Sequence, residues 1–547
     1  MKKIINILLV GVVLLLTTGC NDWLEVNSSG STTKENYFKS YEECRLATAP
    51  LYSKVWFEFN NNFYYALGDG RGNNINAPWS DYIYPFSNLT ETGLTGPLQS
   101  AWQSFYIVIN QADYVLQGLA TAENCTEEQV NACAAEARFM RGVAMWYLAS
   151  LWKNVIIVED PQTFISNPLV APNPFEDVLA FAIKDLEFAA EWLPESDSEP
   201  GRVTKWSALG MLSKFYLTAA CYARGGKFSA TYPTTAAEWY QKAADAAGQV
   251  CEESGLELLP NFEDLFKVQF NNNEEALFSL QWVQGSDEYG SGNSSMRYLA
   301  HSSVSVGGTS AWGAGTFAGG DMVELFHERG DHIRRKATYF CHGETYDYIG
   351  TDSEEGSYTV DASGQEYRCW IKKGVVGSPA DTGGVARDGN SCLMTPMLRL
   401  ADVYLIYAEA LMGLNSETND ERALTFYNKV RTRAGMAEVE LITLADLWNE
   451  RRCELCMEGQ FWFDMLRRAY WDEQYVLDYM GAQKRNQGYT YQPLLVDEEP
   501  FEWSESKMHE REEATPSASC LVLPYPESEL LLNPMLKAEP VPYVFSE

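Results

Sequence analysis

The chain has 547 residues, of which 46% are hydrophobic and 13% aromatic, so it is long and apolar enough for a large core. It carries 41 Lys and Arg against 75 Asp and Glu, which gives a net charge of −34. This charge repels nucleic acid and anionic lipid surfaces, and no basic block interrupts it. We therefore predict no nucleic-acid partner and favour a neutral or cationic ligand.

The first 19 residues have the parts of an export signal. Two lysines precede an apolar stretch at 4–16, which is shorter than the roughly 20 residues that a membrane-spanning helix needs. Small residues then precede Cys20, as in the box of bacterial lipoproteins, although Thr17 stands where Leu is usual. We predict a lipoprotein signal peptide at 1–19 and a lipid on Cys20. An ordinary signal peptide with a chance cysteine is the alternative.

Two long segments have the hydrophobic spacing of helices. In the first, about 98–254, Thr126 and Gln129 form a capping box before a helix that is apolar on opposite sides, so we expect that helix to be buried on two faces. The second runs from about 393 to 470. Paired helices with small residues at their contacts resemble tetratricopeptide repeats, which predicts a stacked helical scaffold.

Three segments lack this helical pattern. Residues 59–97 are rich in Asn, Gly and aromatic residues, residues 271–392 mix short β-like runs with Gly and Ser, and residues 475–520 are acidic and loop-like. Long irregular segments on a helical scaffold are usually functional or disordered, and the aromatic content of the first two argues against disorder.

Seven motifs, taken in order, closely resemble those of the SusD/RagB family of outer-membrane nutrient-binding lipoproteins. The resemblance covers essentially the whole chain from Cys20, with Gly142 and Tyr525 where the family usually has Ala and Ile. The motifs are CNDWLEV, AAEARFMRGVAMWYLASLWKNV, GRVTKWSALGMLSKFYL, RLADVYLIYAEAL, NKVRTRAG, ERRCELCMEGQFWFDMLR and LPYPESELLLNP.

The resemblance implies a mainly α-helical fold with four tetratricopeptide-like helix pairs and a loop-rich, partly β half that binds the ligand. It implies an N-terminal region at 20–254 and a C-terminal region at 255–547, the latter with variable loops at 271–392, helical repeats at 393–470 and a closing segment. It also implies a partner, a SusC-like TonB-dependent barrel over which the lipoprotein sits as a lid, and a location on the outer membrane facing the exterior.

The first candidate site lies in the segment 59–97. Sugars present apolar faces that stack on aromatic rings and hydroxyls that bond to amides and charged groups. Family members bring an Arg and a Trp to the glycan on a short Gly-rich loop at this point. The alternative is that Trp79 and Tyr84 attach the loop to the core. The candidate ligand contacts here are Arg71, Asn73, Asn74, Trp79, Tyr82 and Tyr84.

The second candidate site lies in the segment 271–392. Trp312 stands in a Trp-Gly stretch that resembles one of the family, and Tyr289 is the other candidate ligand contact. Trp282 sits in a β-like run, so we expect it in the core.

Three glutamates, Glu450, Glu454 and Glu458, are spaced four apart and would share one face of a helix, where like charges repel. A glycosidase needs two carboxyl groups astride the scissile bond, one with a raised pKa, whereas neighbouring arginines lower such pKa values. We predict a structural ion network. Four arginines lie near in sequence and are its expected cations: Arg431, Arg433, Arg451 and Arg452.

No metal or other cofactor is expected. Cys453 and Cys456 lie in a helical stretch without the further ligands that zinc needs, so packing is the favoured interpretation. Asp352, Glu354 and Asp361 offer the oxygen ligands that suit calcium, but their spacing matches no EF-hand and a solvated turn is favoured.

These observations predict a cell-surface, non-catalytic lipoprotein that binds oligosaccharides and delivers them to the barrel. A peptide-binding import lipoprotein is the alternative in the same class, because the charge of −34 suits cationic peptides. A secreted helical glycoside hydrolase or lyase is the alternative from another class, disfavoured because no suitable acid pair is evident.

Overall fold

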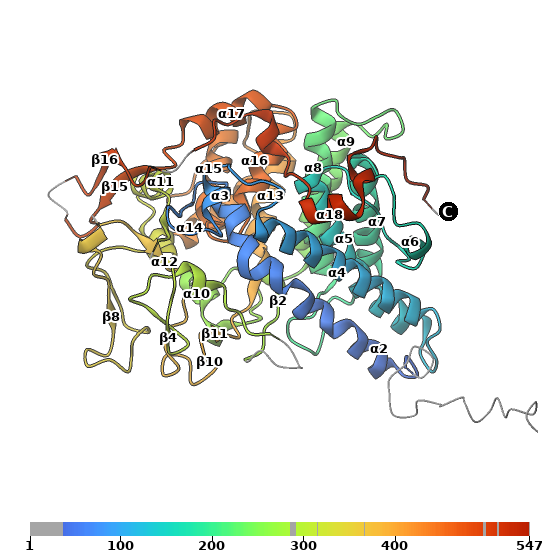
Figure 1. Ribbon diagram of the computed structural model, residues 1–547, viewed down its shortest axis with the longest axis horizontal. Coiled ribbons are helices and arrows are strands. Elements are labelled where there is room, and N and C mark those ends of the chain that lie inside the picture. Colours follow the sequence, from blue (N-terminus) through green and yellow to red (C-terminus); the bar gives the residue numbers. More distant parts are fainter. Residues whose placement is uncertain are drawn as a thin grey trace, which may run out of the picture.

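Helices dominate the chain, and its sheets are small. In Figure 1 long helices stack at one side of the molecule, while loops and short strands, mostly yellow, fill the lower part of the other side. This arrangement confirms the predicted mainly helical fold with a loop-rich, partly β half. The computed structural model describes residues 37–284, 291–313, 315–365, 367–495, 499–510 and 513–545.

Five long helices make up the first helical block, and each packs on the next along the chain. The predicted capping box opens the second of them, with Thr126 and Gln129 bonded to each other's backbone. That helix is buried on two sides, as predicted, because a neighbour packs on each. The five are α4 (Gly96–Leu119), α5 (Glu127–Trp152), α7 (Phe175–Trp192), α8 (Lys205–Arg224) and α9 (Ala236–Glu253).

The second block continues the stack, because α9 packs on both α8 and α13. Four helix pairs in contact are α4 with α5, α7 with α8, α13 with α14, and α15 with α16. The helices of this block are α13 (Leu400–Met412), α14 (Glu421–Arg433), α15 (Leu444–Glu454), α16 (Phe461–Ala469) and α17 (Glu473–Ala482).

A break between α15 and α16 corrects the continuous helix that was predicted to carry Glu450, Glu454 and Glu458. Met457 and Gly459 have φ angles of 63° and 68°, the left-handed conformation that ends a helix. The turn is held from outside as well, since a Cβ on Gly68 would lie 2.2 Å from the Cα of Gly459. Two backbones therefore meet there with no room for a side chain.

Short antiparallel strands join the two loop-rich segments. The sheet order is β1 (Ile75–Asn76), β5 (Phe317–Ala318), β9 (Trp370–Ile371) and β6 (Tyr339–Phe340), so the first segment lies at the edge of a sheet formed by the second. Ile75 faces Ala318 and Asn76 faces Phe317. A separate antiparallel pair, β2 (Ala276–Leu280) with β12 (Thr395–Arg399), brings the two ends of the second segment together.

The remaining elements are short. The helices are α2 (Tyr41–Thr48), α3 (Tyr84–Ser87), α6 (Thr163–Ser166), α10 (Ser295–Leu299), α11 (Gly320–Arg329), α12 (His332–Thr338) and α18 (Glu527–Leu532). The hairpins pair β3 (Ser305–Val306) with β4 (Thr309–Ser310), β7 (Thr345–Tyr346) with β8 (Tyr358–Thr359), β10 (Ala386–Arg387) with β11 (Asn390–Ser391), β13 (Glu417–Thr418) with β14 (Ile442–Thr443), and β15 (Gln487–Tyr491) with β16 (Phe501–Lys507).

Two segments are more regular than the sequence predicted. Wide π-helical turns at Phe59–Phe63 and Ala66–Gly70 replace the start of the first irregular segment. Their aromatic rings are buried against α4 and α5, as in the tilted ring contacts of Phe59 with Phe105 and Tyr147. The acidic segment 475–520 contains α17 and the β15–β16 hairpin.

Candidate ligand-binding site

A cleft of about 360 Å³ lies where the two loop-rich segments meet. One wall comes from the chain just before α3, with Trp79 and Tyr82. The other comes from α10, with Tyr298, and from the loop after β4, with Trp312. The structure thus brings together three aromatic residues that the sequence placed in two separate candidate sites.

The rings at the cleft are unusually open for large aromatic side chains. Trp79, Tyr82 and Trp312 are 52%, 51% and 56% exposed. Tyr298 links two of them, because its ring centroid lies 6.1 Å from that of Tyr82 and 5.4 Å from that of Trp312, edge to face in both cases. Sequence reasoning missed Tyr298, which lies in a short helix with nothing in its local pattern to mark it.

The backbone holds the two tryptophans close to each other. The Trp79 ring packs on Phe317 of β5 at 5.9 Å between centroids. A Cβ on Gly315 would lie 2.7 Å from the Cβ of Trp79, so the loop that carries Trp312 reaches Trp79 only because position 315 is Gly. The backbone N–H of Trp312 donates to the carbonyl of Arg297 at 2.6 Å. Contacts of Trp79 with Phe317 and Gly315 therefore join the two loop-rich segments beside the cleft.

Polar groups complete the lining. Asn61, Tyr65, Ser80, Asp81 and Thr316 line the cleft beside the rings. Burial raises the pKa of Tyr65, so its hydroxyl stays neutral. Among the described residues that line the cleft, Asp81 is the one acidic side chain. Flat rings beside amide and hydroxyl groups are suited to a ligand with apolar faces and many hydroxyls.

Four of the predicted ligand contacts are buried and do not line the cleft, which corrects the prediction for Arg71, Asn73, Asn74 and Tyr84. Their polar groups are used inside the protein. The guanidinium of Arg71 pairs with Glu91 and lies 4.2 Å from the centroid of the Trp462 ring.

The two asparagines have interior partners as well, and the tyrosine is buried. Asn73 donates to Asp321, and Asn74 donates to Asp69 at 2.9 Å. Tyr84 lies at the first position of α3 and is buried. The polar residues of this glycine-rich segment therefore bond within the segment and to neighbouring helices instead of facing a ligand.

Three further predictions concern Trp282, Tyr289 and Cys20. Trp282 is buried and donates to Thr395 at 3.0 Å, which confirms its place in the core. Tyr289 and Cys20 lie outside the described residues, so the ligand contact of the first and the lipid on the second stay predictions.

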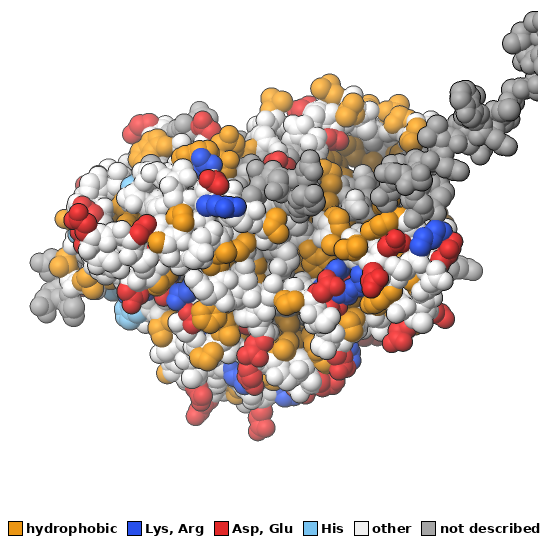
Figure 2. Space-filling model, turned by 90° about the horizontal axis from the view of Figure 1, so that it is seen from below, with side chains coloured by type: hydrophobic (Ala, Val, Ile, Leu, Met, Phe, Trp, Pro, Cys, Tyr) orange, Lys and Arg blue, Asp and Glu red, His pale blue; other side chains and the backbone are white. Residues whose placement is uncertain are grey.

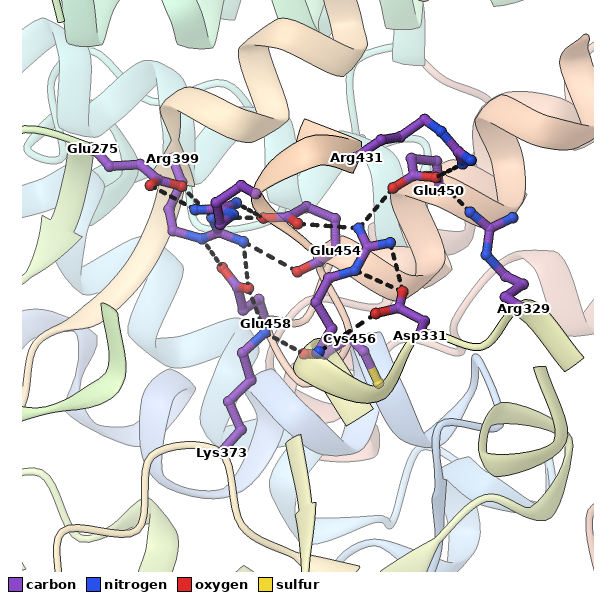
Figure 3. A network of polar contacts seen from close by, with 12 residues as sticks. Glu275, Arg329, Asp331, Lys373, Arg399, Arg431, Glu450, Glu454, Cys456 and Glu458 are labelled. Atoms are coloured by element: carbon purple, nitrogen blue, oxygen red, sulfur yellow. Dashed lines mark hydrogen bonds and ion pairs between the residues drawn. The ribbon is translucent and has the colours of Figure 1, made fainter. Parts of the chain in front are cut away.

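Figure 3 shows the three glutamates surrounded by cations, which confirms the predicted ion network. Glu454 pairs with Arg433 at 2.5 Å and with Arg399 at 3.0 Å. Burial raises the pKa of Glu454, but the neighbouring arginines outweigh burial and hold that pKa at about 2. The further pairs are Arg329, Arg334 and Arg431 on Glu450, Arg334 on Glu454, and Lys373 and Arg399 on Glu458.

Parts of that prediction were wrong. Glu458 lies beyond the end of α15, so the three carboxylates do not share one helix face. Arg451 pairs instead with Asp402 at 2.8 Å, and Arg452 donates to the side chain of Asn74 at 3.0 Å. Cations distant in sequence take their place, because the network joins α12, α15 and β12 (Figure 3).

Neither the cysteine pair nor the acidic loop forms a metal cluster. Both cysteines of the C-x-x-C stretch are buried, and the Sγ of Cys456 lies 3.1 Å from the hydroxyl of Tyr339. In the described part of the chain, no three His, Cys, Asp or Glu side chains come together as metal ligands. Asp352 and Asp361 instead accept hydrogen bonds from serines. Calcium at this loop stays a prediction without support from these contacts.

The charge of the surface and the apolar character of the helices are relevant to partners and to membranes. In Figure 2 acidic side chains outnumber basic ones, and apolar side chains are scattered over the face. None of the helices within the described ranges combines the length and apolar character required to cross a membrane.

Known proteins resemble the chain over most of its length. A SusD-like protein from Bacteroides ovatus is 36% identical over 568 residues, which cover 99% of each chain. The chain belongs to the SusD family. The profile of that family matches residues 274–541, and a profile described as starch-binding associating with outer membrane matches residues 70–217.

Solved structures agree with this membership. A crystal structure with a xylogluco-oligosaccharide is 37% identical to this SusD family protein, has a TM-score of 0.83, and covers 92% of this chain and 100% of its own. A laminarin-binding SusD-like protein shares the fold at 21% identity, with a TM-score of 0.65 and coverage of 90% and 98%.

Proposed function

We propose that this SusD family protein binds an oligosaccharide in the cleft between Trp79 and Trp312. The observation that carries the proposal is the gathering of three half-exposed rings, from segments far apart in sequence, around one cleft. Exposed rings of this size cost free energy in water unless a ligand covers them. The 37% identical structure with a xylogluco-oligosaccharide makes that class of ligand the first to test.

The chemistry of the lining favours a neutral glycan. Trp79, Tyr82 and Trp312 offer apolar faces, and the polar groups beside them are mostly uncharged amides and hydroxyls. Cationic peptides, which the net charge of −34 would suit, need acidic partners, and Asp81 is the single acid among the described lining residues. The cleft therefore supports sugar better than peptide.

The same lining supports binding without catalysis. Hydrolysis of a glycosidic bond by the usual mechanism needs two carboxyl groups roughly 5–10 Å apart on either side of the bond. The described lining residues supply one, Asp81. The remaining candidate carboxylates, Glu450, Glu454 and Glu458, are neutralised by arginines and lysine inside the scaffold.

Delivery to a transporter completes the proposal. A lipid on Cys20 would hold the protein at the outer membrane, where the matching family description also places its members. A captured sugar then needs a second protein to cross that membrane, and a SusC-like TonB-dependent barrel, with this protein as its lid, meets that need. The stacked helices offer the broad surface that repeat proteins use for partners.

The test separates a binder from an enzyme. Purified protein is titrated with xylogluco-oligosaccharides, laminarin oligosaccharides and starch oligosaccharides, and each mixture is assayed afterwards for new reducing ends. We expect saturable binding to at least one of these glycans and no new reducing ends. New reducing ends would show an enzyme, and absence of binding to every glycan would remove the sugar-binding proposal.

A further inference from the structure

Trp312 is more than half exposed, and Arg297 contacts both its ring and its backbone. The guanidinium carbon of Arg297 lies 3.8 Å from the centroid of the Trp312 ring. The carbonyl of Arg297 also accepts the backbone N–H of Trp312 at 2.6 Å. Arg297 therefore holds both the backbone and the ring of this tryptophan.

The guanidinium is itself confined. Gly389, in the turn of the β10–β11 hairpin, has a φ of +79°, and a Cβ built there would lie 3.0 Å from the carbon and two nitrogens of the Arg297 guanidinium. The Nε of Arg297 is buried and has no hydrogen-bond partner among the described residues. The hairpin turn therefore lies close against the same guanidinium that lies over the indole.

The contact between the guanidinium and the indole has a consequence for ligand binding. An exposed side chain on a loop samples several rotamers, and fixing it when a ligand arrives weakens the affinity by roughly two- to tenfold. A guanidinium stacked on the ring fixes the rotamer beforehand, through cation–π attraction and planar contact that an ammonium provides less well. With one face on Arg297, an exposure of 56% leaves much of the Trp312 ring open to the cleft.

We propose that Arg297 is a positioning residue that pre-orders Trp312 for the ligand without touching the ligand itself. The inference rests on the proposed binding of an oligosaccharide in this cleft. Arg297→Met removes the planar cation and keeps much of the length of the side chain. Arg297→Lys keeps the positive charge and removes the planar guanidinium group.

The first experiment measures affinity of the full mature chain for xylogluco-oligosaccharides by calorimetry. We expect Arg297→Met to weaken binding about three- to tenfold and Arg297→Lys to recover part of the loss. In a Trp312→Ala background the same substitution should change nothing further, because its effect passes through the ring. Arg387→Met is the matched control, since Arg387 is a well-exposed arginine of the same hairpin. An equal loss in the Trp312→Ala background would show direct ligand contact and overturn the inference.

The second experiment needs no ligand. Protein labelled with 5-fluorotryptophan is studied by fluorine NMR, and the Trp312 resonance is identified by its loss in Trp312→Phe. Arg297→Met should shift and broaden this resonance, whereas Arg387→Met should leave it unchanged. An unchanged resonance in Arg297→Met would overturn the positioning role whatever the ligand. A shifted resonance in a protein that binds none of the glycans would contradict the proposed function while leaving the Arg297–Trp312 contact in place.

Discussion

Trp79 and Arg71 lie on one short segment, yet the structure gives them opposite surroundings. Trp79 is half exposed at the cleft, whereas Arg71 is fully buried against Glu91 and Trp462. Exposure of a large ring is the informative observation for a ligand contact, and burial of a charge is the informative observation for an ion pair. Residue type alone does not distinguish these cases.

Arg71→Met should therefore destabilise the protein without weakening sugar binding. The substitution leaves Glu91 buried without its cation, which costs about 3–5 kcal/mol in the free energy of unfolding. Glu91→Gln in the same chain should restore part of that loss. Denaturant unfolding and calorimetric titration measure the two quantities. Unchanged stability together with a clear loss of affinity would return Arg71 to the ligand site.

At the scale of elements, the helices were predictable and the cleft was only partly so. The helix that begins after Thr126 follows from its capping box and its apolar spacing, both local. The closeness of Trp79 and Trp312 depends on the pairing of β1 with β5 and on Gly315, contacts between residues distant in the chain. A sequence shows that both tryptophans stand in polar loops and does not show that they line the same cleft.

The ion network was likewise predictable only where it depends on residues near in sequence. Local spacing identified the three glutamates and pointed correctly to Arg431 and Arg433. Arg399 comes from β12, and its role follows only from how β12 packs on α15. The break between the two helices also escaped prediction, because it depends on the approach of Gly68 to Gly459.

The network predicts acid sensitivity of the scaffold. The pKa of Glu454 lies at about 2 in the folded protein against an ordinary 4.5, so its ion pairs stabilise the fold above pH 4.5 and lose that effect as the pH falls toward 2. The difference corresponds to about 3 kcal/mol in the free energy of unfolding.

Thermal unfolding between pH 7 and pH 2 measures this effect. Glu454→Gln should lower the melting temperature at pH 7 and flatten the decline in acid, because the substituted side chain has no proton to gain. Glu440→Gln, at an exposed glutamate outside the network, should follow the unaltered protein. If the melting temperatures of Glu454→Gln and of the unaltered protein fell in parallel from pH 7 to pH 2, the role given to Glu454 would be contradicted.

At the scale of the whole molecule, the stacked helices and the cleft serve different parts of the proposal. In the proposal the stacked helices, which lie together at one side of the molecule in Figure 1, offer the surface for a partner. The cleft lies where the two loop-rich segments meet. A stable lid on a barrel should bury well over about 1,200 Å² in total. Such an interface survives gentle detergent extraction.

Purification of the tagged protein from outer membranes tests this part. A TonB-dependent barrel should copurify at near-equal stoichiometry, and the complex should bind the glycan more tightly than the lipoprotein alone. Cys20→Ala should remove the protein from the membrane fraction because no lipid is attached. Should the variant still take up a palmitate analogue, or should no barrel copurify, the tethered lid would be excluded.

The most direct measurement is calorimetric titration of xylogluco-oligosaccharides into the unaltered protein, Trp79→Ala and Trp312→Ala. Each substitution should weaken binding by about 1–3 kcal/mol, because it removes an aromatic face that covers a sugar, while the melting temperature changes little. Tyr114→Ala, at an exposed ring on α4 away from the cleft, is the control and should leave affinity unchanged. Unaltered affinity in both tryptophan variants, with a large loss of stability, would show that these rings belong to the core and contradict the site.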